Sequence, residues 1–172
     1  MTQQRIFLVG PMAVGKSTIG RALAQYLHYE FVDSDHEIEA RTGADISWIF
    51  DVEGEAGFRK REEAVIDEYS QRDGVVLATG GGAVINALNR ERLKNRGFVI
   101  YLTAPVEALV ERTVYDKKRP ILQQSSDRGD IFRRILSERG PLYESVADHT
   151  LNTSNLSQRQ IIRRLAEVFC QA

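Results

Sequence analysis

The chain has 172 residues and a formal net charge of −1, and 42% of its residues are hydrophobic while 27% are charged. This length suits one domain, and the balanced charge predicts neither nucleic-acid binding nor a disordered acidic tail. No apolar run approaches the roughly 18 residues of a membrane span, and residues 1–10 lack the apolar core of a signal peptide. The single cysteine, Cys170, excludes an intramolecular disulfide, so we expect a cytoplasmic protein without nucleic-acid or membrane partners.

Short apolar runs alternate with segments of helical period along the chain. The runs predict strands at 6–9, 31–33, 75–78, 98–102 and 149–151. The helical periods predict helices at 16–27, 36–41, 46–50 (with Asp45 as cap), 55–69, 131–143 and 157–169, one more between the third and fourth strands, and one with Pro105 in its first turn. This alternation predicts an α/β fold in which helices cover both faces of a parallel sheet.

The segment 116–129 is polar and lacks periodicity. It is too long for an ordinary connector between two elements. We therefore interpret it as part of a lid or functional loop, which spans about residues 113–127.

Residues 10–18, GPMAVGKST, follow the first predicted strand directly. Gly10, Gly15, Lys16 and Ser17 meet the pattern G-x-x-x-x-G-K-[ST], and a predicted helix opens at the lysine. Successive backbone N–H groups and a helix N-terminus bind anions, the lysine adds positive charge, and the serine hydroxyl can bind Mg²⁺. The sequence therefore predicts a nucleotide-phosphate site.

Ala13 stands inside this loop, at a position where the pattern allows any residue. With a negative φ the alanine costs little, whereas a positive φ costs roughly 1–2 kcal/mol. In either case the lysine, the serine and the helix end remain, so we expect the loop to bind a nucleotide.

Three classes of protein could use such a loop. A GTP switch needs an N-K-x-D element, which is absent, and the D-x-x-G match at 51–54 follows a helix instead of a strand. A mechanical or regulatory ATPase needs a strand that ends in acids, whereas the strand 75–78 ends in TGGG. The third class, a small-molecule kinase, is favoured by the residues that follow the other strands.

Asp33 and Asp35 follow the second predicted strand, at the edge of a parallel sheet where ligands bind. A kinase needs one acid near the metal and one that orients or deprotonates the attacking hydroxyl. A helix cap would account for one of these two aspartates but not for both.

Three glycines and three arginines could complete such a site. Residues 80–82 let backbone approach a ligand, unless they form only a flexible turn. Arg59 and Arg139 could clamp a carboxylate, and Arg119 could close over the phosphates. Most arginines make only weak surface pairs, so the spacing alone leaves these roles open.

Together these motifs resemble the shikimate kinase family, and the resemblance covers nearly the whole chain. The motifs are GPMAVGKSTIGR at 10–21, FVDSDHEIEARTG at 31–43, IFDVEGEAGFRKRE at 49–62, LATGGGAV at 77–84, KKRP at 117–120 and ERGPLYESVAD at 138–148. The resemblance implies a P-loop kinase fold related to nucleoside monophosphate kinases, with three α/β/α layers and a five-stranded parallel sheet in the order 2-3-1-4-5. It also implies a single domain with a core, a substrate-binding region at about 33–62 and the lid, and we expect a monomer.

The implied reaction moves the γ-phosphate of ATP to the 3-hydroxyl of shikimate, in the route to chorismate and the aromatic amino acids. A kinase of another small hydroxy acid such as gluconate remains the alternative. The resemblance implies the following roles: Asp35, Lys16 and Arg119 in catalysis; Ala13, Val14, Gly15, Lys16, Ser17, Thr18, Arg112 and Arg119 for ATP; Ser17 and Asp33 for Mg²⁺; Asp35, Arg59, Gly80, Gly81, Gly82 and Arg139 for shikimate. Ala13 replaces the glycine that is usual in the family.

Overall fold

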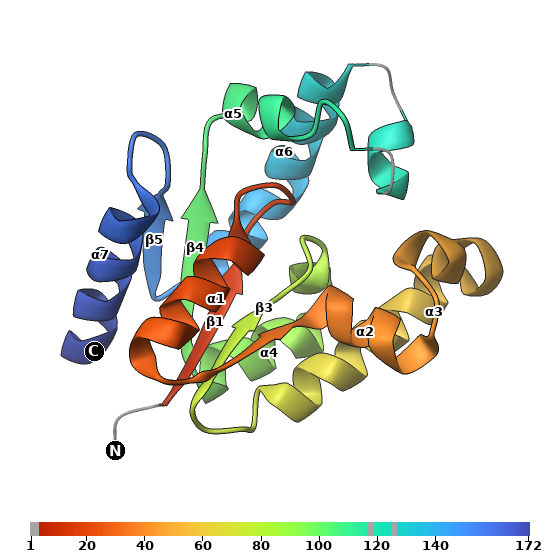
Figure 1. Cartoon of the computed structure of the whole chain (residues 1–172). Helices are drawn as coiled ribbons and strands as arrows, with labels where there is room; N and C mark the ends of the chain where they lie inside the picture. The colour runs from red at the N-terminus through yellow and green to blue at the C-terminus, as the bar shows by residue number, and fades with distance from the viewer. Residues whose placement is uncertain (1–3, 117–118, 125–126) are drawn as a thin grey trace.

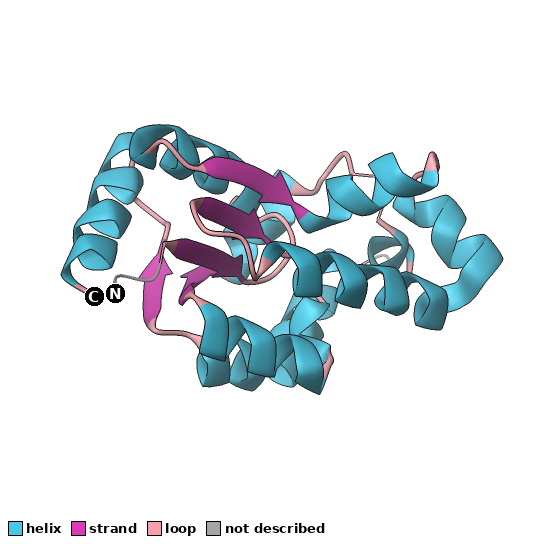
Figure 2. Ribbon diagram, turned by 90° about the horizontal axis from the view of Figure 1, so that it is seen from below, coloured by secondary structure: helices cyan, strands magenta, loops and turns pink. Residues whose placement is uncertain are grey.

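The strands of the described residues form one five-stranded parallel sheet in the order β2-β3-β1-β4-β5 (Figure 2). The computed structural model describes residues 4–116, 119–124 and 127–172. The strands are β1 (Arg5–Val9), β2 (Glu30–Asp33), β3 (Val75–Ala78), β4 (Phe98–Thr103) and β5 (His149–Asn152). The helices are α1 (Lys16–Leu27), α2 (Ser34–Thr42), α3 (Ile46–Tyr69), α4 (Ala87–Arg96), α5 (Val106–Arg112), α6 (Arg128–Val146) and α7 (Gln158–Gln171), with short 3₁₀ turns η1 (Ala83–Ile85) and η2 (Pro120–Gln123). The predicted fold class and strand order are confirmed.

Side chains of the central strand β1 alternate between two hydrophobic cores. Ile6 and Leu8 pack in the core that α1 and α7 cover, whereas Phe7 and Val9 pack in the core that α3 and α4 cover. All four side chains are fully buried. This is the alternation that a strand buried on both faces requires, and it produces the three layers seen in Figure 2.

The functional segments lie at one edge of this sheet, because parallel strands all end there. The loop 10–15 follows β1, Asp33 ends β2, and residues 79–82 follow β3. In Figure 1, α5 and η2 lie on one side of this edge and α2 with the first half of α3 on the other.

No helix of the described residues is long and apolar enough to cross a membrane.

Several element boundaries differ from the prediction. The helix α2 begins two residues early because Asp33 caps it, and Pro105 lies at the N-cap of α5 instead of in its first turn. The predicted helices at 46–50 and 55–69 form the single element α3, kinked at Gly54, whose φ is 71°. The helix predicted at 131–143 is longer in the structure, since α6 begins at Arg128 and continues to Val146.

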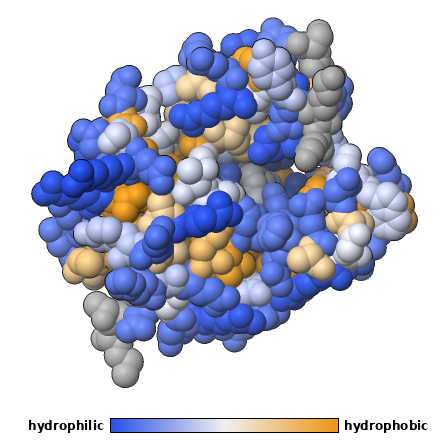
Figure 3. Space-filling model, viewed as in Figure 1, coloured by the Kyte–Doolittle hydropathy of each residue, from blue (hydrophilic) through white to orange (hydrophobic). Residues whose placement is uncertain are grey.

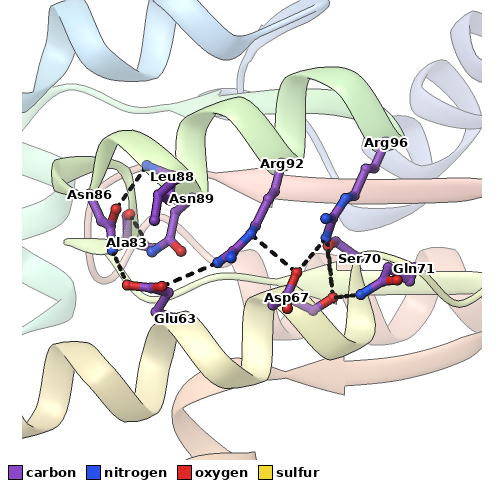
Figure 4. A network of polar contacts seen from close by, with 10 residues as sticks. All are labelled: Glu63, Asp67, Ser70, Gln71, Ala83, Asn86, Leu88, Asn89, Arg92 and Arg96. Atoms are coloured by element: carbon purple, nitrogen blue, oxygen red, sulfur yellow. Dashed lines mark hydrogen bonds and ion pairs between the residues drawn. The ribbon is translucent and has the colours of Figure 1, made fainter.

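An ionic network ties the second half of α3 to α4 (Figure 4). Asp67 of α3 pairs with Arg92 at 3.1 Å and with Arg96 at 2.8 Å. On the same helix α4, the buried Asn89 donates to the carbonyl of Ala83 in η1 at 3.0 Å. The network therefore connects α3 with the turn that follows the three glycines.

Candidate active site

A pocket of about 330 Å³ lies at the carboxyl edge of the sheet. The molecular surface is hollowed between the part that carries α5 and the part that carries α2 and α3 (Figure 3). The pocket is lined by Met12, Ala13, Gly15, Lys16, Ser17, Thr18, Asp33, Asp35, Thr79, Gly80, Gly81, Arg112 and Arg119. The structure thus brings the phosphate loop, both aspartates, two of the glycines and two arginines together.

The side chain of Lys16 reaches back across the phosphate loop and binds its first two residues. Its Nζ donates to the carbonyls of Gly10 at 2.7 Å and of Pro11 at 2.8 Å, and only 8% of the residue is exposed. Burial lowers the pKa of Lys16 to about 8, although Asp35 and Asp33 counteract this. The ammonium group is thus held at the loop, where an anionic ligand would gain most from it.

Ala13 has a φ of 67°, which is the strained alternative of the two that the sequence left open. Arg112, at the end of α5, donates from one Nη1 to the carbonyls of Ala13 and Val14, both at 3.1 Å. The arginine therefore holds the strained part of the loop in place. The side chain of Val14, in the same loop, is buried in the hydrophobic core and does not line the pocket.

Asp33 joins the phosphate loop to α2. One of its carboxylate oxygens accepts a hydrogen bond from Ser17 Oγ, and the other accepts from the backbone N–H of His36 at 3.1 Å. The capping role and the position beside Ser17 therefore belong to the same residue. Two hard oxygen donors fit Mg²⁺, which keeps several waters and binds few protein ligands. The described residues contain no cluster of three histidine, cysteine or acidic side chains that could hold a metal.

Asp35 and Glu62 point their carboxylates at Gly80. A Cβ on this glycine would lie 2.6 Å from Asp35 Oδ1 and 2.9 Å from Glu62 Oε2, so a larger residue at position 80 would displace these carboxylate oxygens. Both oxygens are buried without a hydrogen-bond partner. Burial raises the pKa of Asp35 to about 6 and the pKa of Glu62 to about 7, and the Arg59 guanidinium counteracts both shifts.

Arg59 lies against the third glycine of the turn. Its Nη1 pairs with Glu62 Oε1 at 2.9 Å, and a Cβ on Gly82 would lie 2.7 Å from the same Nη1. Arg139 on α6 faces the hydroxyl of Tyr143, which donates to the carbonyl of Gly81. These contacts form a second cluster around the glycines, next to the pocket.

The predicted site residues therefore divide into two groups. The nucleotide residues other than Val14, both aspartates, Gly80 and Gly81 line the pocket. Arg59, Gly82 and Arg139 belong to the adjoining cluster. Sequence reasoning assigned no role to Met12, Ser34, Glu62, Thr79 and Tyr143. Glu62 and Tyr143 carried local signals, because each lies three or four residues from a predicted arginine on the same helix, Glu62 from Arg59 and Tyr143 from Arg139.

Arg119 lines the pocket from the segment predicted as a lid. Its guanidinium pairs with Asp116, and η2 begins at the next residue. Residues 117–118 and 125–126 of that segment, including both lysines of the KKRP motif, lie outside the described residues.

A phosphate loop and an acid with an unpaired oxygen in one pocket define a nucleotide-dependent kinase of small molecules. The family model described as Shikimate kinase matches residues 12–170. The chain belongs to the shikimate kinase family, whose members are ATP-dependent small-molecule kinases.

Curated relatives agree with this assignment over nearly the whole chain. The shikimate kinase of Vibrio parahaemolyticus is 57% identical over 169 residues, which are 96% of this chain and 98% of the relative. That of Pasteurella multocida is 55% identical, with 96% of this chain and 95% of the relative covered.

Solved structures give the same result. The shikimate kinase of Acinetobacter baumannii in complex with shikimate has a TM-score of 0.94 and 49% identity, and covers 99% of this chain and 94% of its own. A gluconokinase from Sinorhizobium meliloti has a TM-score of 0.56 and 16% identity, with 99% of this chain and 98% of its own covered. The second likeness shows a shared fold alone.

Proposed function

We propose that this kinase transfers the γ-phosphate of ATP to the 3-hydroxyl of shikimate, in the route to chorismate and the aromatic amino acids. The observation that carries the proposal is the position of Asp35. Its unpaired carboxylate oxygen is buried in the pocket that Lys16 and Ser17 also line. The 49% identical relative solved with shikimate supports the choice of acceptor.

ATP binds with its phosphates on the loop of residues 13–18. The backbone N–H groups and the N-terminus of α1 receive the phosphate oxygens. Lys16 then exchanges its two carbonyl partners for phosphate oxygens, which bear more negative charge. Arg112 binds on the nucleotide side, and Arg119 stabilises the charge of the transferred phosphoryl group.

Ser17 and Asp33 are the residues that hold Mg²⁺, because their oxygens already lie together beside the loop. The ion, when bound, neutralises charge on the phosphates. Thr18 is the second hydroxyl residue that this segment contributes to the pocket wall, after Ser17.

Asp35 orients the acceptor hydroxyl and takes its proton as the oxygen attacks the γ-phosphorus and the bond to ADP breaks. A pKa of about 6 suits this task, since a base works best when its pKa lies near the working pH. Arg59 and Arg139 bind the shikimate carboxylate, and the backbone of Gly80, Gly81 and Gly82 contacts the ring hydroxyls.

The chain divides into regions with different tasks in the reaction. Residues at about 33–62 form the substrate-binding region and about 113–127 the lid, both attached to a core within a single kinase domain. The position of α2, α3, α5 and η2 around the carboxyl edge supports this division (Figure 1). The enzyme works as a cytoplasmic monomer without nucleic-acid or membrane partners, and the balanced charge supports the absence of a nucleic-acid partner.

A coupled assay of ADP release with ATP and Mg²⁺ tests the acceptor. Shikimate, gluconate and no acceptor are compared on the same preparation, and the product is checked for phosphate on the 3-hydroxyl. We expect turnover with shikimate only. Equal activity on gluconate, or turnover without an acceptor, would contradict the proposal.

A further inference from the structure

We propose that Tyr143 is a positioning residue for the acceptor, acting through Gly81 and Arg139 without touching the substrate. This inference rests on the proposed function and concerns the same site. Tyr143 is fully buried in α6, and its hydroxyl donates to the carbonyl of Gly81. Arg139 precedes it by four residues, so both side chains lie on the same face of the helix.

The hydrogen bond from Tyr143 holds the backbone of the glycine turn at a fixed distance from α6. On its other side Gly81 lies against the phosphate loop, where an added Cβ would be 3.2 Å from the backbone nitrogen of Met12. The neighbouring Gly80 N–H donates to the buried hydroxyl of Ser34 at 3.0 Å. The turn is therefore anchored from α2 and from α6, while it separates the nucleotide side from the acceptor side.

The Tyr143 hydroxyl also faces the guanidinium of Arg139. Burial raises the pKa of the Tyr143 hydroxyl, and Arg139 counteracts part of this shift, as expected for a cation close to the oxygen. With its proton directed at the Gly81 carbonyl, the oxygen presents its lone pairs to the arginine. The Tyr143 hydroxyl thereby fixes the positions of two groups that bind the acceptor, the backbone of the glycine turn and the guanidinium of Arg139.

Packing alone does not require this hydroxyl. The ring of Tyr143 packs against that of Tyr101 with centroids 5.0 Å apart and the planes tilted by 30°, and phenylalanine would retain this contact. A buried tyrosine hydroxyl needs a partner, yet here the partner is the carbonyl of a turn that lines the pocket. Loss of the hydroxyl should therefore affect the site more than the fold.

The test is Tyr143→Phe, with Tyr101→Phe as the matched control. Tyr101 is 6% exposed, belongs to the same aromatic pair and does not line the pocket. We expect Tyr143→Phe to raise KM for shikimate about tenfold, to leave KM for ATP within about twofold, and to retain cooperative unfolding. Tyr101→Phe should leave both KM values within about twofold.

Three results would overturn the inference: no change in KM for shikimate, equal increases in both KM values, or the same increase in the control variant. Unfolding midpoints of both variants are measured first, so that kinetics are recorded on folded protein. Arg139→Ala separates this inference from the proposed function. If Arg139→Ala raises KM for shikimate and Tyr143→Phe does not, only the positioning role fails; if neither variant raises it, the proposed acceptor site fails.

Discussion

Replacement of Ala13 by glycine separates strain in the phosphate loop from affinity for the nucleotide. Ala13 has a φ of 67°, and Arg112 holds its carbonyl. We expect this strain in the free and the nucleotide-bound enzyme, because the contacts that hold the loop come from the protein itself. Glycine should relieve it in the free and the bound enzyme alike, so stability changes while affinity hardly does.

The size of the effect follows from two opposing contributions. A left-handed alanine costs roughly 1–2 kcal/mol relative to glycine. Glycine in turn gives the unfolded chain more freedom, which lowers stability by about 0.4–1 kcal/mol. The net gain in unfolding free energy should lie at about 0–1.5 kcal/mol, with the dissociation constant of ATP changed less than about fivefold.

Denaturant unfolding and calorimetric titration with a non-hydrolysed ATP analogue measure the two quantities. His28→Gly is the control, because His28 has a φ of 58° at the exposed C-cap of α1, away from the pocket. It should reproduce the stability change with no effect on affinity. A gain of several hundredfold in nucleotide affinity on Ala13→Gly would refute this reasoning, since the strain would then arise on binding.

Three further predictions concern the acceptor side. Arg139→Ala should raise KM for shikimate about 100-fold and KM for ATP only a few-fold, as initial-rate kinetics with each substrate varied would show. Asp35→Asn should lower kcat by about 10²–10⁴ with no loss of unfolding midpoint, and a loss of kcat below tenfold would exclude Asp35 as the base. Glu62 has a folded pKa of about 7 against 4.5, so its stabilisation is complete below pH 4.5 and lost as the pH rises through 7. The stability of Glu62→Gln relative to the natural chain should therefore rise between pH 5 and pH 8, by at most roughly 3 kcal/mol. Denaturant unfolding of both proteins at the two pH values measures this, and an unfolding free-energy difference that stays constant with pH would contradict the raised pKa.

Local patterns predicted most of the architecture. The period of apolar residues placed α1 at Lys16–Leu27 as observed, and Asp45 caps α3 by accepting from the N–H of Trp48. These features depend on neighbours within one or two turns of the chain. The strand order could not be derived from such patterns, and it came from the family resemblance.

Contacts between distant segments account for what the sequence did not reveal. Ser34 bonds to Gly80, and Tyr143 to Gly81, across 46 and 62 residues of chain. The φ of Ala13 depends on how the whole loop closes, so both alternatives stayed open until the structure was known. Helix α6 is longer than the predicted 131–143, since Asp127 caps its start from within the segment that lacks periodicity.

The contact between Gly80 and Asp35 limits how this site can vary during evolution. Glycine is the smallest residue, and aspartate is the shortest side chain that carries a carboxylate. An alanine at position 80 would displace Asp35 Oδ1, and no shorter acid exists to make room. A substitution at position 80 would therefore move the carboxylate of Asp35, and no change of residue 35 could restore its position and keep the acid. We expect natural variation to accumulate elsewhere in the pocket wall before it reaches these two positions.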